Sequence, residues 1–336
     1  MATTKFTGLK NWQDLTGDWH QNYPFRGAEP FPVKVTPESA HFLAWGPDAD
    51  GLHRTANPVY VSTKALTTGI FYLSPGDYFK PNNHPSPESY IILSGTLWVG
   101  NGETGQYAQL EPGDAYVIPA FAFHSGYNFG DETVEILFMI TRQTHTDEMR
   151  ANPTYDDHYQ NVRKPIVLHD EVEHRYQRHP SWIQPGYRAG ESPESRLDDL
   201  LCWPPRDGKS VHHNFDVDHK QIVGRKDWLH LVTGSNYQHQ FLTSFCYSTN
   251  EFQTGKIKVP PARVTTAIRV KGERVYYPQS ETPLIVVLSE SGNTLVGKKG
   301  DGLFVPANMT HQFQNMGSRS IEALFVSATY EGVTYY

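Results

Sequence analysis

The sequence predicts an all-β protein built from two similar halves. Short strand-forming segments recur at regular spacing between residues 67 and 326, separated by turn-forming glycine and proline. The chain of 336 residues has 19 Tyr, 17 Phe and 7 Trp together with 24 Pro and 27 Gly, a composition that suits strands and turns better than helices. The two halves also repeat one another in sequence. These three observations favour two β-sandwiches or barrels in tandem.

Composition and charge exclude several classes of function. The formal net charge is -7, so the chain has no basic surface for nucleic acid and no polybasic membrane patch. Its two cysteines, Cys202 and Cys246, are too few for a disulfide framework and lack Cys-x2-Cys metal spacing. No apolar run approaches the ~20 residues of a membrane span, and the first residues lack the apolar segment of a signal peptide. We therefore expect a soluble, cytoplasmic protein.

The first half of the chain divides into an arm and a barrel. Residues 1–60 are rich in aromatics and interrupted by prolines, which excludes a long helix and predicts an N-terminal arm. Residues 61–145 are expected to form the first barrel, because strand signals become dense there. The strands are expected at 69–73, 89–95, 96–100, 115–119 and 134–140.

The second half begins with a connector. Residues 146–240 are rich in charge, histidine and proline, with one short helix expected at Glu194–Leu201. The connector histidines His212, His213 and His219 are interpreted as part of a solvated polar loop rather than a metal site. Residues 241–336 are expected to form the second barrel, whose strands are expected at 257–259, 263–270, 284–288, 302–305 and 321–326.

The two halves align without gaps when the first is shifted by 187 residues. Ten identities then fall in the 26 positions from Gly113 to Phe138, far above chance, which indicates an internal duplication. The pair Leu93-Ser94 recurs as Leu288-Ser289 at a shift of 195. That second match predicts eight extra residues in the first copy and places Pro283 at the position of Glu88.

One stretch carries the candidate chemistry. It reads Gly76-x5-Asn82-x-His84-x3-Glu88-x6-Gly95, followed by Gly113-x5-Pro119-x4-His124-x3-Asn128. His84, Glu88 and His124 come from two strand-like segments and suit a site for one first-row divalent ion. A set of two histidines and one carboxylate with open positions is typical of Fe(II) chemistry.

These two motifs resemble those of the cupin superfamily, and the duplication resembles its two-domain members, the bicupins. The resemblance covers about residues 65–141 and 255–330 and implies two tandem double-stranded β-helix (jelly-roll) barrels. Asn82 stands where the family usually carries its first histidine, and Phe121 replaces a glycine of the second motif. Asn82 could be a weak ligand, a hydrogen-bond partner of a ligand, or neither.

In the second copy His311 alone matches a ligand position, so its metal site is expected to be degenerate. A lone histidine on a strand is usually a hydrogen-bonded core or pocket residue. We expect this barrel to serve as scaffold and dimer surface, or to close the pocket of the first. A homodimer is expected because open sheet edges favour further pairing.

Three functions fit these patterns. Aromatic residues crowd the motif strands and favour a planar or aromatic substrate, as for an Fe(II)-dependent dioxygenase that cleaves a carbon–carbon bond with O2. The first alternative is a non-oxidative isomerase, lyase or decarboxylase in which Tyr90 or Tyr127 handles protons; Zn, Mn or Ni are the alternative metals. The second alternative is a binding or storage protein without chemistry.

Overall fold

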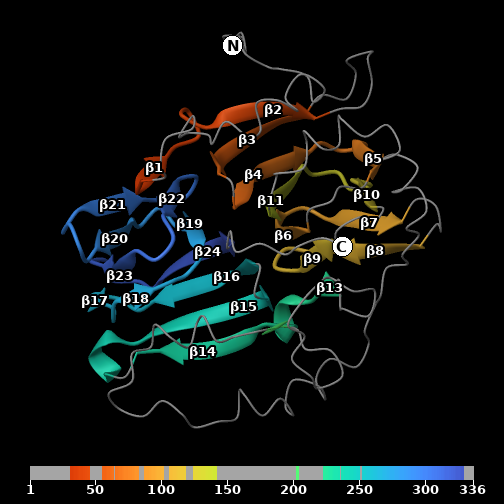
Figure 1. Ribbon diagram of the computed structural model, residues 1–336. Helices are drawn as coiled ribbons and strands as arrows, with labels where there is room; N and C mark the ends of the chain where they lie inside the picture. The colour runs from red at the N-terminus through yellow and green to blue at the C-terminus, as the bar shows by residue number, and fades with distance from the viewer. Residues whose placement is uncertain are drawn as a thin grey trace, which may run out of the picture. The chain divides into compact units, whose positions relative to one another are not determined.

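The computed structural model describes residues 31–45, 55–63, 65–82, 87–101, 106–118, 124–141, 202–203, 222–234, 236–249 and 252–328 (Figure 1). These residues form strands and two short 3-10 helices, as the sequence predicts for an all-β chain. They group into two compact units, one of residues 1–28, 38–114 and 118–166, the other of residues 29–37, 115–117 and 167–336. Within the described part of the chain, no helix has the length and apolar character needed to span a membrane.

The first unit contains two antiparallel sheets. One has the strand order β6-β11-β4-β3-β2, and the other has the order β5-β10-β7-β8. The strands are β2 (His41–Trp45), β3 (Thr55–Ser62), β4 (Leu66–Leu73), β5 (Tyr78–Asn82), β6 (Glu88–Ser94), β7 (Leu97–Asn101), β8 (Gln106–Leu110), β10 (His124–Tyr127) and β11 (Val134–Thr141).

The second unit also contains two antiparallel sheets. One has the order β1-β22-β19-β24-β16-β15-β12 with β14 beside β15, and the other has the order β17-β23-β20-β21 with β18 beside β23. β9 (Ala115–Ile118) pairs with β13 (Ile222–Val223). The other elements are β1 (Val33–Val35), β12 (Cys202–Trp203), η1 (Arg225–Asp227), β14 (Leu229–Thr233), η2 (Tyr237–His239), β15 (Phe241–Thr249), β16 (Phe252–Val259), β17 (Arg263–Val264), β18 (Ile268–Arg269), β19 (Glu273–Pro278), β20 (Leu284–Leu288), β21 (Thr294–Gly297), β22 (Gly302–Val305), β23 (Thr310–Asn315) and β24 (Ile321–Ala328).

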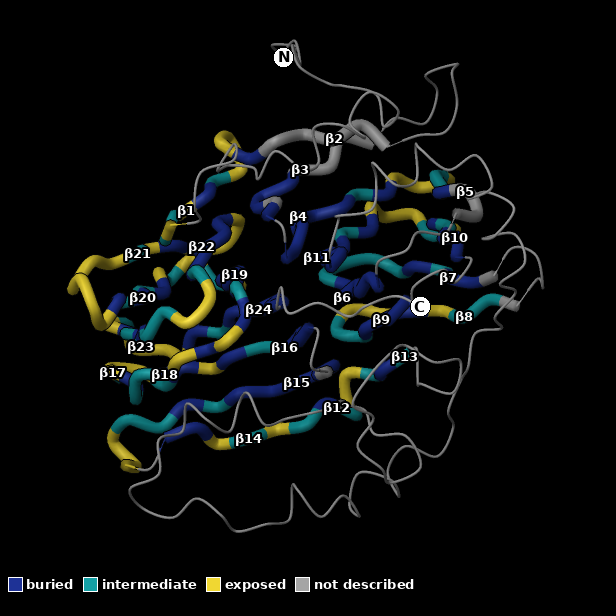
Figure 2. Tube along the Cα trace, viewed as in Figure 1, coloured by how far each residue is buried: buried dark blue, intermediate teal, exposed yellow. Residues whose placement is uncertain are grey.

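The strand β11 shows why these segments form sheets. Its sequence is rich in β-branched and large apolar residues, and every residue pairs with β4 on one side, most of them also with β6 on the other. Only Glu135 of this strand is partly exposed, because the strand lies in the middle of its sheet. Figure 2 shows the same burial along the central strands of the second unit, where Tyr276, Phe313 and Phe325 belong to the core.

The structure corrects several expected boundaries. Residues 41–45 and 55–60, expected within the N-terminal arm, belong to strands β2 and β3 of the first unit's sheet. The second barrel was expected to begin at residue 241, but β14, at residues 229–233, already belongs to its sheet. The strand expected at 263–270 is two short strands, β17 and β18, and β19 was not expected. The expected helix Glu194–Leu201 and the connector histidines His212, His213 and His219 lie outside the described residues.

Strand pairing confirms the duplication. In the first unit Gly126 pairs with Val99, and in the second Phe313 pairs with Val286, so both partners are shifted by 187. The preceding strands follow a shift of 186, because Tyr90 pairs with Phe138 in the first unit and Tyr276 with Phe325 in the second.

The predicted eight extra residues in the first copy are wrong. The hairpins that follow have equal lengths, since Leu97 pairs with Leu110 and Leu284 with Gly297, both partners shifted by 187. The second copy instead carries one extra residue between β19 and β20. The two Leu-Ser pairs misled the alignment because Leu93-Ser94 ends β6, whereas Leu288 ends β20, the counterpart of β7.

One asparagine in each unit fixes the same turn. Asn128 is buried; its Nδ2 donates to the carbonyl oxygens of Leu73 (2.9 Å) and Glu132 (2.7 Å), and its Oδ1 accepts from the amide of Gly130 (2.9 Å). Asn315 repeats this arrangement in the second unit, with Nδ2 bonded to three carbonyl oxygens and Oδ1 to the amide of Gly317. The motif asparagine is therefore a structural residue that closes a turn and is no part of the candidate metal site.

Candidate metal centre

Three predicted site residues of the first unit meet at one point. The Tyr90 hydroxyl donates to Oε2 of Glu88 over 3.0 Å, and Nε2 of His124 lies 3.4 Å from the same oxygen. Glu88 and Tyr90 are wholly buried, and His124 is 1% exposed. A carboxylate enclosed to this degree needs polar partners or a cation, because burying an isolated charge is costly.

The strands bring these side chains together by alternation and pairing. Glu88 and Tyr90 are two residues apart on β6, so they point to the same side of the sheet, as the sequence predicted. His124 begins β10, where its backbone pairs with that of Asn82 on β5. The pairing register therefore sets the backbone of Asn82 opposite that of His124, on the strand next to β10.

The donor atoms of Glu88 and His124 fit a single metal ion. Ligand atoms bound at ~2.1 Å to one first-row ion lie roughly 3.0–3.4 Å from each other, depending on the coordination angle. The 3.4 Å between Nε2 of His124 and Oε2 of Glu88 agrees with this separation. Imidazole and carboxylate together suit Fe, Mn, Ni or Zn.

Two other predicted ligands cannot be placed as fully. His84 lies outside the described residues, so its position stays a prediction. Asn82 ends β5 opposite His124, and nothing is described of its side chain. Its place in the register agrees with any of the roles left open for it.

Aromatic rings pack against Tyr90 and His124, the two residues next to the Glu88 carboxylate. The ring of Phe79 lies 6.2 Å from that of Tyr90, 6.2 Å from the imidazole of His124 and 5.6 Å from Phe71. Glycine at position 126 makes this possible, because a Cβ there would lie 2.2 Å from the Phe79 ring. Two of the aromatic residues expected to line the site, Phe79 and Tyr90, therefore pack together beside His124.

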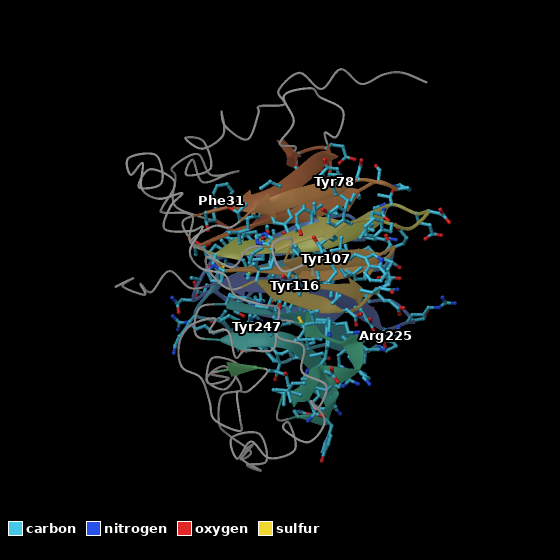
Figure 3. The ribbon with its side chains drawn as sticks, turned by 90° about the vertical axis from the view of Figure 1, so that its right-hand side faces the viewer. Phe31, Tyr78, Tyr107, Tyr116, Arg225 and Tyr247 are labelled. Atoms are coloured by element: carbon cyan, nitrogen blue, oxygen red, sulfur yellow. The ribbon has the colours of Figure 1, made fainter. Side chains whose placement is uncertain are left out.

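Tyr127, the second tyrosine predicted to handle protons, belongs to a different cluster. Its ring stacks on Tyr78 at 5.6 Å and on the exposed Phe129 at 5.3 Å, and meets Tyr107 edge-on (Tyr78 and Tyr107 are labelled in Figure 3). Burial raises the pKa of Tyr127, and the neighbouring hydroxyl of Tyr107 adds to this effect. The geometry thus supports Tyr90, and not Tyr127, as the proton-handling residue beside Glu88.

The second unit has other residues at most of the candidate ligand positions. The strand register places Arg274 at the position of Glu88, because Arg274 pairs with Ser327 as Glu88 pairs with Ile140. The earlier alignment of Pro283 with Glu88 is therefore wrong. By the same register Ile268 stands at the position of Asn82, and Val270 follows it where His84 follows Asn82.

His311, the one remaining ligand position, makes two hydrogen bonds. Its Nδ1 lies 2.9 Å from the carbonyl oxygen of Met309, which only a protonated nitrogen can bond, and its Nε2 lies 2.6 Å from the Tyr276 hydroxyl. Burial lowers the pKa of His311 to about 4, so the imidazole is neutral and accepts at Nε2 from Tyr276. Nε2 of His311, the counterpart of the His124 atom nearest Glu88, thus already accepts a hydrogen bond from Tyr276, which agrees with the expected degenerate site.

Comparison with known proteins supports the same fold. Residues 69–140 match the Cupin domain family. No curated protein sequence matches the chain significantly. Among solved structures, AerE from Microcystis aeruginosa has a TM-score of 0.51 at 11% identity, covering 86% of this chain and 98% of its own.

Oxalate decarboxylases are also similar in structure. The Lactobacillus farciminis enzyme in its formate complex has a TM-score of 0.53 at 15% identity, covering 92% of this chain and 89% of its own. The Bacillus subtilis enzyme, studied for its Mn(II) centres, has a TM-score of 0.53 at 15% identity, covering 99% of this chain and 86% of its own. At such identities the likeness shows the fold. The first unit thus contains a stretch that matches the Cupin domain family, and the fold of the chain is similar to that of these solved structures, in agreement with the tandem barrels expected from the sequence.

Proposed function

We propose that this protein is a metal-dependent enzyme whose first barrel binds one divalent ion through His84, Glu88 and His124. The observation that carries this proposal is the convergence of Oε2 of Glu88 and Nε2 of His124, 3.4 Å apart in a site closed to solvent. A binding or storage protein would have no need of a buried carboxylate aimed at an imidazole. The Cupin domain match over residues 69–140 supports the same site.

The residues around the ion would have different roles. When bound, the ion would act as a Lewis acid that holds and polarises an oxygen of the substrate. Glu88 would compensate its charge, and Tyr90 would hold the carboxylate in place through the 3.0 Å hydrogen bond. Phe71 and Phe79 would exclude water and pack against an apolar part of the substrate.

For the reaction class we propose an Fe(II)-dependent dioxygenase acting on an aromatic or diketone-like small molecule. Two histidines and one carboxylate leave open positions for a bidentate substrate and O2, the arrangement used by non-haem Fe(II) oxygenases. The aromatic wall of Phe71, Phe79 and Tyr90 supports a planar substrate.

A non-oxidative reaction is the second candidate, and one contact favours it. The Tyr90 hydroxyl is protonated and buried next to the proposed ligand, where it could deliver a proton to a substrate carbon or oxygen. The structural likeness to oxalate decarboxylases, one of them with Mn(II) centres, is compatible with this class. A decarboxylase, isomerase or lyase would use Mn, Zn or Ni without O2.

Metal analysis of the purified protein tests the proposal. We expect about one ion per chain, lost in Glu88→Gln and in His124→Asn. The matched control is His311→Asn, which changes the equivalent histidine of the second unit and should leave the metal content unchanged. A metal content near zero, with no gain on reconstitution with Fe(II) or Mn(II), would leave the binding or storage function in its place.

Oxygen dependence separates the two reaction classes. A panel of catechols, β-diketones and small carboxylic acids is incubated with the Fe(II)- and Mn(II)-loaded protein, with and without O2. The dioxygenase proposal requires that turnover stop without O2 and that oxygen atoms enter the product. Turnover that continues without O2 would exclude the dioxygenase and establish the non-oxidative alternative.

A further inference from the structure

The second barrel buries an arginine at the position where the first carries its metal-binding carboxylate. Arg274 is 1% exposed and is among the largest fully buried side chains of the described residues. Its neighbour two residues along β19 is Tyr276, the counterpart of Tyr90. The same place in the two barrels therefore carries opposite charges, Glu88 in one and Arg274 in the other.

The charge of Arg274 has no anionic partner in the described part of the chain. Its Nη2 donates to Oε1 of Gln253 over 2.7 Å, a neutral acceptor, and none of the ion pairs there includes Arg274. The phenol of Tyr276 and the imidazole of His311 are both neutral, because burial raises the pKa of Tyr276 to about 12 and lowers that of His311 to about 4. Burying an unpaired charge is costly, and an arginine cannot avoid that cost by losing its proton, because its pKa is too high.

Two nitrogen atoms of the guanidinium have N–H groups that make no hydrogen bond. Nε and Nη1 are buried and have no hydrogen-bond partner, although most buried donors in proteins have one. The guanidinium also interacts with the hydroxyl of Tyr276, a neutral group, and this interaction lowers the pKa of Tyr276 against the larger effect of burial. Phe325 covers one face of the group, with Cζ 4.4 Å from the ring centre. Such a cation–π contact stabilises the charge through the face but offers no acceptor to N–H groups, which point outward in the guanidinium plane.

We propose that the second barrel is an anion site, in which Arg274 binds a small organic carboxylate. A planar carboxylate can accept two parallel hydrogen bonds from a guanidinium, here from Nη1 or Nε together with the remaining hydrogen of Nη2. Gln253 holds the guanidinium in place, and the apolar residues Ile268 and Val270 stand where the first barrel has Asn82 and His84. The site is distinct from the proposed metal centre and does not depend on it.

Titration of the full-length protein with sodium acetate and sodium malonate, followed by calorimetry at pH 7, tests the proposal. We expect saturable binding that weakens about tenfold or more in Arg274→Met, because the charge-assisted hydrogen bonds are lost. In buffer without carboxylate, Arg274→Met should melt at the same or a higher temperature than the wild type, since replacing a buried charge that lacks a partner by an apolar side chain is often stabilising.

Gln253→Glu provides a second variant in case Arg274→Met does not fold. It places a carboxylate 2.7 Å from Nη2, where the amide oxygen now lies, so it should raise the melting temperature and prevent acetate from binding. The control is His124→Asn, which should lose metal and still bind acetate. No saturable binding by the wild type, unchanged binding in Gln253→Glu, or equal binding of sodium chloride and sodium sulfate would overturn the carboxylate site.

Discussion

The Tyr90→Phe substitution tests how the proposed metal ligand is held. It removes one oxygen atom from a side chain that is wholly buried and leaves the ring with its Phe71 and Phe79 contacts. The lost interaction is the 3.0 Å hydrogen bond to Oε2 of Glu88. Hydrogen bonds to charged groups contribute about 1.5–3 kcal/mol, because the alternative is a carboxylate with one partner fewer.

This energy sets the expected loss of metal affinity. Every 1.4 kcal/mol is about a factor of ten in a binding constant, so roughly 1.5–3 kcal/mol corresponds to about 10–100-fold weaker metal binding. The same range is typical when a hydrogen-bond partner of a metal ligand is removed. Competition between the protein and a chromophoric chelator, measured with Mn(II) and Fe(II) at pH 7, gives the affinity ratio directly.

Tyr276→Phe is the matched control, since Tyr276 holds the equivalent position in the second barrel. It should leave metal affinity unchanged while it breaks the bond to His311. If Tyr90→Phe binds metal as tightly as the wild type, the hydrogen bond from Tyr90 does not orient Glu88 for metal binding. Tighter binding would mean that Tyr90 competes with the metal for the carboxylate.

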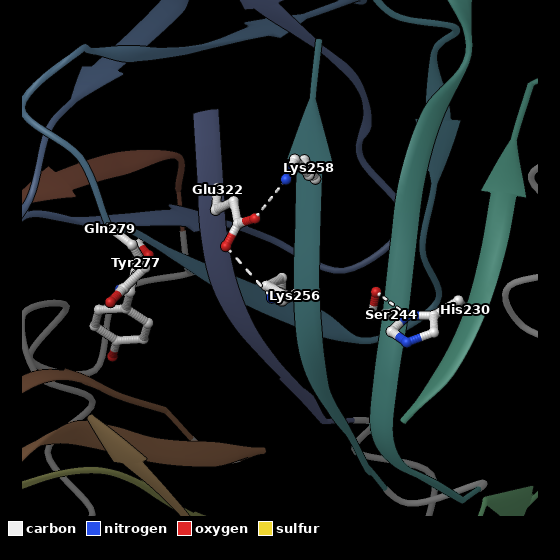
Figure 4. A network of polar contacts seen from close by, with 7 residues as sticks. All are labelled: His230, Ser244, Lys256, Lys258, Tyr277, Gln279 and Glu322. Carbon is white, nitrogen blue, oxygen red and sulfur yellow. Dashed lines mark hydrogen bonds and ion pairs between the residues drawn. The ribbon is translucent and has the colours of Figure 1, made fainter. Parts of the chain in front are cut away.

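The remaining predictions concern stability. Asn315→Ala should cost about 2–4 kcal/mol in denaturant unfolding, because it leaves three carbonyl oxygens and one amide of a buried turn unpaired. His311 has a folded pKa of about 4, below its unfolded value near 6.5, so stability should fall as the pH drops from about 6.5 toward 4; His311→Asn should remove that slope. Burial raises the pKa of Glu322, but Lys258 and Lys256 outweigh it and lower the pKa overall (Figure 4). The stability from this half-buried cluster should be small, present above the ordinary glutamate pKa and lost as the pH falls through the lowered folded pKa. Glu322→Gln should flatten only that acid part of the profile of unfolding free energy against pH.

Sequence patterns were sufficient for the fold and for part of the site. Alternation on a strand placed Glu88 and Tyr90 on one face, and the structure joins them by a hydrogen bond. The shift of 187 between Gly113–Phe138 and its repeat predicted the equivalence of His124 and His311, which the pairing of β20 with β23 confirms. These predictions succeeded because they depended on local spacing, which strand geometry fixes.

The equivalence of Arg274 and Glu88 could not be predicted from the sequence, and the reason is physical. The strand of Arg274, β19, contains two charged residues, two tyrosines and a terminal proline, so it lacks the apolar run that marked the other strands. A match of only two residues, Leu-Ser, then put Pro283 in the place of Glu88, nine positions beyond Arg274. The one-residue insertion between β19 and β20 could be found only from the pairing partners on β24, because β6 and β19 share a single identity, the tyrosine at positions 90 and 276.

The two barrels therefore predict one metal ion per chain, and the reason lies in the tyrosine they share. In the first barrel the Tyr90 hydroxyl serves the carboxylate of Glu88, so Nε2 of His124 stays directed at the same oxygen. In the second, arginine has replaced the carboxylate, and the Tyr276 hydroxyl bonds to Nε2 of His311 instead. A cation there would meet a positive guanidinium and an imidazole whose lone pair is taken. Two ions per chain in the loaded protein, or one ion that persists in Glu88→Ala and disappears in His311→Ala, would show that the metal centre lies in the other barrel.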